Sequence, residues 1–150
     1  MALAADMALL RSTPLFEELG DEELRLIAFS ARKSVFREGE RVMERGAPAP
    51  GASIVMMGAL EATDADGHAE VKESGALLDE LALVMPRGHG VEAVALEDGA
   101  VMRVERSLFL HVVEEYPRVA EIVRGRIGDR LEALLASIEP VAERLARVED

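Results

Sequence analysis

Turn residues recur at short, regular intervals between residues 33 and 104, and this rhythm limits the fold more than any other feature of the chain. Short apolar runs such as Ile54–Met57 and Val101–Val104 are separated by glycines and prolines. Asp66-Gly67 and Asp98-Gly99 each lie between two such runs, which is the strongest local signal for a β-hairpin. Turn signals about 8–12 residues apart are typical of antiparallel sandwiches and rolls. The pattern therefore predicts short antiparallel strands over residues 33–104.

Helical patterns flank this strand region on both sides. Asp21 can cap the first amides of a helix that continues with apolar residues at helical spacing, and Pro117 suits the first turn of a later helix. Residues 78–84 interrupt the strand rhythm and predict a short internal helix. We therefore expect one α+β domain over residues 1–150. It would comprise N-terminal helices (1–32), an antiparallel, jelly-roll-like β-roll (33–104) and a C-terminal helical pair that ends in a long helix (107–150).

The last predicted helix carries a heptad pattern. Its apolar residues alternate at intervals of four and three, as in a coiled coil, and the positions are Ile127, Leu131, Leu134, Ile138, Val141 and Leu145. This seam has two interpretations: it packs against the roll, or it pairs with the same helix of a second chain. The seam extends beyond what the roll needs to cover, so we expect a homodimer.

Charge and cysteine content restrict the partners and the compartment. The formal net charge is −12, and a surface of this sign repels phosphate backbones, so nucleic acid is not an expected partner. The absence of cysteine fits a reducing compartment. The sequence has no apolar run of about 18 residues and no basic segment before its apolar start, so we expect neither a membrane span nor a secretory signal. A cytoplasmic protein is the expectation.

The order and spacing of several motifs resemble the cyclic nucleotide-binding domain, the fold of bacterial catabolite activators and of kinase regulatory subunits. Each motif alone is weak, but together they cover roughly residues 9–123. The matching segments are Leu15-Phe16, Phe36–Val42, Ile54–Gly58, Glu80–Leu83, Val94–Asp98 and Phe109–Pro117. The resemblance implies a β-roll that binds cAMP or cGMP and regulates another activity without catalysing a reaction.

The resemblance also implies a phosphate site at the amino end of the internal helix, where free amides favour an anion. In the family a glycine lets the backbone approach the phosphate, and the next glutamate binds the ribose hydroxyl. An arginine about nine residues later pairs with the phosphate, and a Ser or Thr follows it. Here Glu80 keeps the glutamate position, but Asp79 replaces the glycine, His89 the arginine and Glu92 the Ser or Thr. Arg87 is the alternative source of a cation.

These replacements predict a degenerate ligand site. The candidate residues are Asp79, Glu80, Leu81, Ala82, Arg87, His89 and Glu92. Loss of a buried, charge-paired arginine costs about 2–5 kcal/mol of affinity, or roughly thirtyfold to several thousandfold. We therefore expect cyclic nucleotide binding to be weak, altered or lost, with signalling through the dimerising helix to a downstream protein partner. A different small ligand, and a structural interaction module without a ligand, are the alternatives.

Histidines raise a remote alternative, a cupin-like metalloenzyme. That site needs closely spaced histidines with a carboxylate, whereas His68, His89 and His111 are isolated in the sequence. No arrangement typical of a catalytic triad is visible either. We therefore expect no metal, no cofactor and no enzymatic activity.

Overall fold

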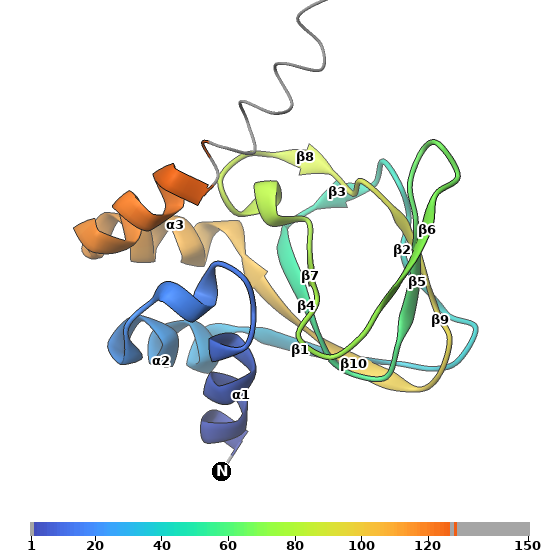
Figure 1. Cartoon of the computed structure of the whole chain (residues 1–150), viewed down its shortest axis with the longest axis horizontal. Helices are drawn as coiled ribbons and strands as arrows, with labels where there is room; N and C mark the ends of the chain where they lie inside the picture. The colour runs from blue at the N-terminus through green and yellow to red at the C-terminus, as the bar shows by residue number, and fades with distance from the viewer. Residues whose placement is uncertain (1, 127, 129–150) are drawn as a thin grey trace, which may run out of the picture.

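Helices and strands occupy opposite sides of the molecule in the computed structural model, which describes residues 2–126 and 128. Figure 1 shows the helices gathered on one side of a roll of strands. The helices before the roll are α1 (Ala2–Arg11), the 3₁₀ turn η1 (Phe16–Glu18) and α2 (Asp21–Ser30). After the roll, α3 (Arg106–Glu115) is followed by a further helical stretch, residues 117–126, which begins at the expected proline.

The strands form two four-stranded antiparallel sheets and one small pair. The first sheet has the order β1-β10-β4-β7, and the second has the order β2-β9-β5-β6. The first contains β1 (Arg32–Phe36), β10 (Gly99–Glu105), β4 (Gly51–Met57) and β7 (Leu77–Leu78). The second contains β2 (Arg41–Met43), β9 (Glu92–Ala95), β5 (Leu60–Thr63) and β6 (Ala69–Lys72), while β3 (Pro48–Ala49) pairs with β8 (Arg87–Gly88). This arrangement confirms the α+β class and the β-roll.

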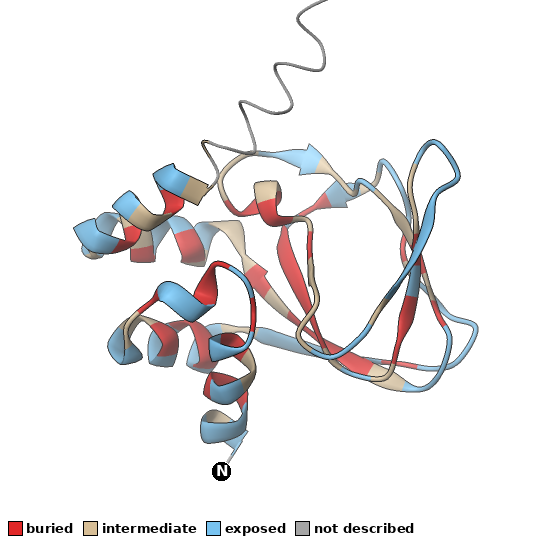
Figure 2. Ribbon diagram, in the orientation of Figure 1, coloured by how far each residue is buried: buried red, intermediate tan, exposed pale blue. Residues whose placement is uncertain are grey.

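One strand supplies two separate hydrophobic cores. Side chains alternate across a strand, so neighbours on β4 point to opposite faces. Ile54 packs in the cluster formed with the helices, whereas Val55 packs in the cluster between the two sheets. Both are fully buried, and Figure 2 shows β4 as the most continuously buried strand. The helices and the second sheet are therefore held on opposite faces of the first sheet.

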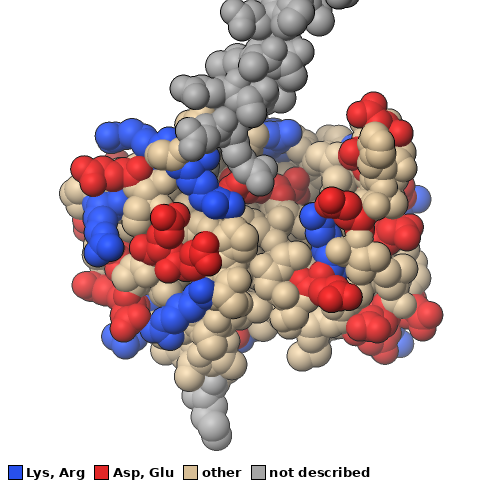
Figure 3. All heavy atoms as spheres, in the orientation of Figure 1, with Lys and Arg blue, Asp and Glu red and all other residues tan. Residues whose placement is uncertain are grey.

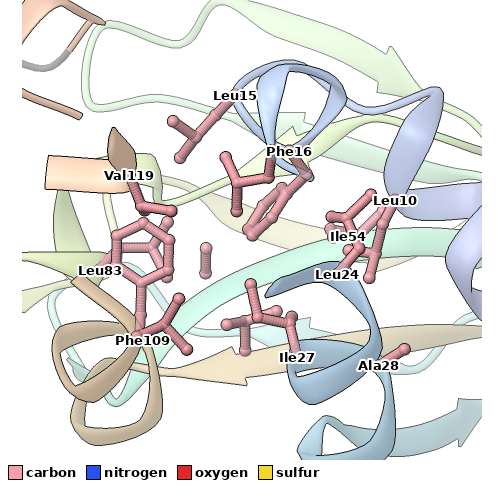
Figure 4. Packing of buried hydrophobic residues seen from close by; sticks show 14 of the residues in the cluster. Leu10, Leu15, Phe16, Leu24, Ile27, Ala28, Ile54, Leu83, Phe109 and Val119 are labelled. Atoms are coloured by element: carbon pink, nitrogen blue, oxygen red, sulfur yellow. The ribbon is translucent and has the colours of Figure 1, made fainter. Parts of the chain in front are cut away.

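Two aromatic rings join the helices to each other. Phe16 follows α1, Phe109 lies on α3, and both are fully buried. Their ring centroids lie 6.1 Å apart with an interplanar angle of 78°, an edge-to-face contact. Figure 4 shows both rings among aliphatic side chains of the same cluster. The segments before and after the roll thus share one core.

One predicted hairpin is present and the other is wrong. Around Asp66-Gly67, β5 and β6 pair as expected, and Gly67 adopts a φ of +85°. Around Asp98-Gly99, however, β9 and β10 belong to different sheets. Gly99 is needed there for another reason, since a Cβ on it would lie 2.1 Å from the carbonyl oxygen of Met57. This glycine allows close approach of two strands and does not form a two-strand turn.

The predicted internal helix is shorter than expected. Leu77 and Leu78 form strand β7, opposite Ile54 and Ser53 of β4, and only Glu80–Leu83 form a 3₁₀ turn, η2. Asp79 between them has a φ of +61°, in the left-handed region. A left-handed residue interrupts a right-handed helix, so the prediction of a helix over 78–84 was wrong. A single 3₁₀ turn also offers less of a helix dipole than the anticipated anion site would use.

The predicted heptad seam cannot be compared with the structure, because its six positions from Ile127 to Leu145 lie outside the described residues. Among the described helices, none combines the length and the apolar content needed to cross a lipid bilayer.

Candidate functional site

A cavity of about 460 Å³ opens between the β5–β6 hairpin and the segment that follows β7. This volume lies within the range of pockets for small ligands. Its lining is rich in charge, with four carboxylates against two full cations and one histidine. These are Asp64, Glu70, Asp79 and Glu80 with Lys72, Arg87 and His68. Such a lining favours a cationic or neutral guest over a phosphate.

Asp79 and His89 form an internal pair at the wall of this cavity. Nδ1 of His89 lies 2.6 Å from Oδ2 of Asp79, and the backbone N–H of Gly90 donates to Oδ1 at 3.3 Å. The two side chains are only 4% and 14% exposed. Because a carboxylate accepts hydrogen bonds, the ring nitrogen donates to it. Both oxygens of Asp79 are therefore bound by the segment that contains His89.

Glu80 makes an internal ion pair with Arg126. Its side chain is 3% exposed, and Oε1 accepts a hydrogen bond from Nε of Arg126. Arg126 stands at the end of the helical stretch 117–126, so this contact joins the cavity to the C-terminal part of the described chain. A buried carboxylate without a cation would be costly, and the arginine offsets that cost.

Arg106 positions the turn that carries these carboxylates. Its Nη1 donates to the carbonyl oxygens of Ala82 at 3.1 Å, Met85 at 3.3 Å and Ala49 at 3.2 Å. These acceptors belong to η2, to the segment after it and to β3. The first residue of α3 thus fixes the 3₁₀ turn against the roll.

The hairpin side of the cavity is negatively charged at neutral pH. The backbone N–H of His68 bonds to Asp64 and lowers the pKa of that carboxyl. Lys72 bonds to Glu70 and lowers the pKa of that group as well. On the face of the molecule shown in Figure 3, acidic side chains occur on both the helical part and the roll, interspersed with basic ones.

The histidines do not form the metal site considered from the sequence. His68 lies in the β5–β6 loop, His89 pairs with Asp79, and His111 lies on α3. Within the described residues, Asp64, Asp66 and His68 have ligand atoms within 4.8 Å of one another. The side chain of Asp64 already accepts hydrogen bonds from the backbone N–H groups of Asp66 and His68, and these bonds stabilise the β5–β6 loop.

Comparison with known proteins decides the family. A family model described as "Cyclic nucleotide-binding domain" matches residues 33–116. The chain belongs to this family. It is similar to the structure of a cyclic nucleotide-binding-like protein from Brucella abortus, with 32% identity over 73% of this chain and 97% of that one, and a TM-score of 0.63. The resemblance inferred from the motifs is therefore confirmed.

Two further proteins are similar to this cyclic nucleotide-binding domain. The sensor domain of the transcriptional regulator DNR from Pseudomonas aeruginosa has the same fold, with 20% identity, 91% and 95% coverage of the two chains and a TM-score of 0.74. An uncharacterized NTE family protein from Mycobacterium tuberculosis is 26% identical over 109 residues. That match spans 72% of this chain but 19% of the relative.

The structure separates the candidate ligand residues into two groups. Asp79, Glu80, Leu81 and Arg87 line the cavity. The lining does not include Ala82, which is fully buried within η2, or Glu92 on β9, which pairs with Arg41 at 3.0 Å. It does not include His89 either, which contacts the lining residue Asp79. Arg87 on β8 lines the cavity together with Lys72, and its role as a cation for a ligand stays a prediction.

Sequence reasoning missed Arg126 and Arg106. Arg126 is 46 positions from Glu80, and nothing in its own neighbourhood marks it as a partner. Arg106 is a basic residue at the start of a helix, where the helix macrodipole disfavours a cation. That unfavourable position was a signal that its side chain bonds to another part of the chain.

Proposed function

We propose that this cyclic nucleotide-binding domain is a non-catalytic regulatory domain whose nucleotide pocket is held by contacts between its own side chains. The observation that carries the proposal is the 2.6 Å contact between Asp79 and His89. In the family these two positions face the cyclic phosphate, as a glycine and an arginine. Here the cation position is already paired with a carboxylate, so a phosphate would have to displace Asp79 from it.

The electrostatics of the rest of the cavity add to this barrier. Four carboxylates line it, and Lys72 already pairs with Glu70 at 2.8 Å. A phosphate that entered beside Asp79 would meet negative charge in a partly buried site, where screening by salt is weak. Arg87 alone offsets only part of this charge. We expect cAMP and cGMP to bind weakly or not at all.

Glu80 and Arg126 suggest how the domain transmits a signal. The family uses this glutamate for the ribose, whereas here it pairs with the end of the helical stretch 117–126. A ligand that competes for Glu80 would release Arg126 and alter the position of the helix that carries it. In this proposal the C-terminal helix pairs two copies of the chain through the heptad positions and passes the change to a downstream protein in the cytoplasm.

We assign the cavity to binding and not to catalysis, because the matching family model describes a nucleotide-binding domain. The mycobacterial relative matches over only 19% of its own length, so this assignment concerns the domain alone.

Isothermal titration calorimetry of the unmodified protein tests the proposal. With cAMP or cGMP added up to about 1 mM, we expect no saturable heat, because Asp79 occupies the phosphate position. Binding is then weaker than 1 mM, which is less than about 4 kcal/mol of free energy. Stoichiometric binding of either nucleotide with a micromolar dissociation constant would contradict it.

A ligand-free interaction module is the second candidate. The Asp79–His89 hydrogen bond and the Glu80–Arg126 ion pair favour it, because they engage two of the four carboxylates that line the pocket without any guest. The two candidates differ in the response of the C-terminal helix. In a regulatory domain, addition of a small ligand would change the rate of amide hydrogen exchange over residues 117–126. In a purely structural module, no small ligand would change that rate.

A further inference from the structure

A second cavity, of about 320 Å³, lies on the other side of the Asp79–His89 pair. His89 lines it, while its partner Asp79 lines the first cavity, so the pair stands between the two. The remaining lining comes mainly from β1, β2, β4 and β10, the part of the roll where the two sheets face each other.

The lining of this second cavity has the opposite charge to the first. It contains Arg32, Lys33, Arg103 and His89, and none of the described residues that line it is an aspartate or a glutamate. The whole chain has 29 acidic residues and 17 Lys and Arg residues. A cavity with only basic ionisable groups is therefore unexpected in this protein.

Three polar side chains lie in one row across the first sheet. Arg32 on β1 is opposite Arg103 on β10, and Arg103 is opposite Ser53 on β4. Residues directly opposite each other point to the same face of a sheet. The face that carries this row turns toward the second sheet, because Val55 and Val101, two residues along the same strands, pack in the cluster between the sheets. The hydroxyl of Ser53 is therefore buried on this face, with Arg103 (39% exposed) beside it and Arg32 (69% exposed) at the rim of the cavity.

The positive charge of this row is only partly neutralised. Glu105 pairs with Arg32 at 2.8 Å and with Arg103 at 3.7 Å, so one carboxylate serves two guanidinium groups. Lys33 is paired separately with Asp6. Nε of Arg103 is shielded from solvent and makes no hydrogen bond within the described part of the chain. A buried donor without an acceptor costs free energy, and a guest with oxygen acceptors would remove that cost.

We propose that this second cavity binds a small molecule through a compact oxyanion, a phosphate or carboxylate group held by Arg103, Arg32 and Ser53. Arginine presents donors in a planar fork that suits both groups. The volume admits a small metabolite and not a polymer. Because His89 lines this cavity, the guest would contact the partner of Asp79 and so be sensed at the wall of the first cavity. This inference does not depend on the proposed loss of nucleotide binding.

NMR titration of the full chain tests the proposal with two probes at constant ionic strength, potassium phosphate and potassium succinate. We expect saturable shifts of the backbone amides of Ser53 and Arg103 with at least one probe, and the tighter probe identifies the oxyanion. Arg103→Gln is expected to raise its dissociation constant at least tenfold. Arg37→Gln, which makes the same charge change at an exposed turn, is expected to leave it within twofold.

Two results would overturn this proposal. One is the absence of saturable shifts at Ser53 and Arg103 with both probes. The other is an equal loss of affinity in both variants, since that would reflect the net charge of the protein and not a site. If Arg103→Gln fails to fold, Arg32→Gln replaces it, because that side chain is 69% exposed and its removal leaves the core intact. At least a threefold loss of affinity is then expected, and no loss would count against the site.

Discussion

Replacing Asp79 by glycine and His89 by arginine together is expected to raise the affinity for cAMP by about a hundredfold or more. The change removes a carboxylate from the phosphate position and restores the cation that the family uses there. A buried charge pair of this kind contributes about 2–5 kcal/mol, and each 1.4 kcal/mol is a factor of ten. Glycine also suits the φ of +61° at position 79 better than aspartate does. Calorimetric titration of folded protein with cAMP measures the gain.

The single variants provide the matched controls for this experiment. In His89→Arg, Asp79 is still present beside position 89 and is expected to pair with the new guanidinium. The gain in cAMP affinity should therefore be less than tenfold. In Asp79→Gly, the carboxylate is removed but the arginine is still missing, so a small gain is expected again. A double variant that folds normally yet binds cAMP no better than the unmodified protein would show that another feature closes the pocket.

Truncation of Phe109 to alanine is expected to cost about 3–5 kcal/mol of the free energy of unfolding. Its ring is fully buried and meets Phe16 edge to face, so its loss removes buried area and leaves a cavity between helices from the two ends of the chain. For a protein of this size the loss corresponds to a fall in Tm of roughly 6–20 °C. Urea titration followed by circular dichroism measures it.

Phe29→Ala is the control for that truncation. Phe29 lies at the end of α2 with 82% of its surface exposed, so the same chemical change there removes little buried area. We expect less than about 0.5 kcal/mol of destabilisation. Equal losses in the two variants would contradict the assignment of Phe109 to the shared core.

Local signals were sufficient to predict the roll and the family. The rhythm of turns reports strand length directly, and motifs such as Phe36–Val42 and Ile54–Gly58 keep their order along the chain. The hairpin at Asp66-Gly67 also follows from its own residues, because the turn requires a positive φ that glycine provides. Features determined within about ten residues were therefore predictable.

Features that depend on distant segments were not. The Asp98-Gly99 signal does not show which sheet each flanking strand joins, because β10 pairs with the distant strands β1 and β4. Leu77 and Leu78 read as helix residues until β4 is placed beside them. The sequence predicted which residues occupy the family's ligand positions, and that assignment stays a prediction, but the pairing of Asp79 with His89 needed the fold.

The most direct test of the account is the NMR signal of the proton on Nδ1 of His89, assigned by its absence from His89→Gln. We predict a downfield-shifted signal in the unmodified protein, loss of that shift in Asp79→Asn, and no change on addition of cAMP in tenfold excess. If cAMP removes or moves the signal, the nucleotide displaces Asp79 from His89, and the claim that this internal hydrogen bond closes the phosphate position is wrong.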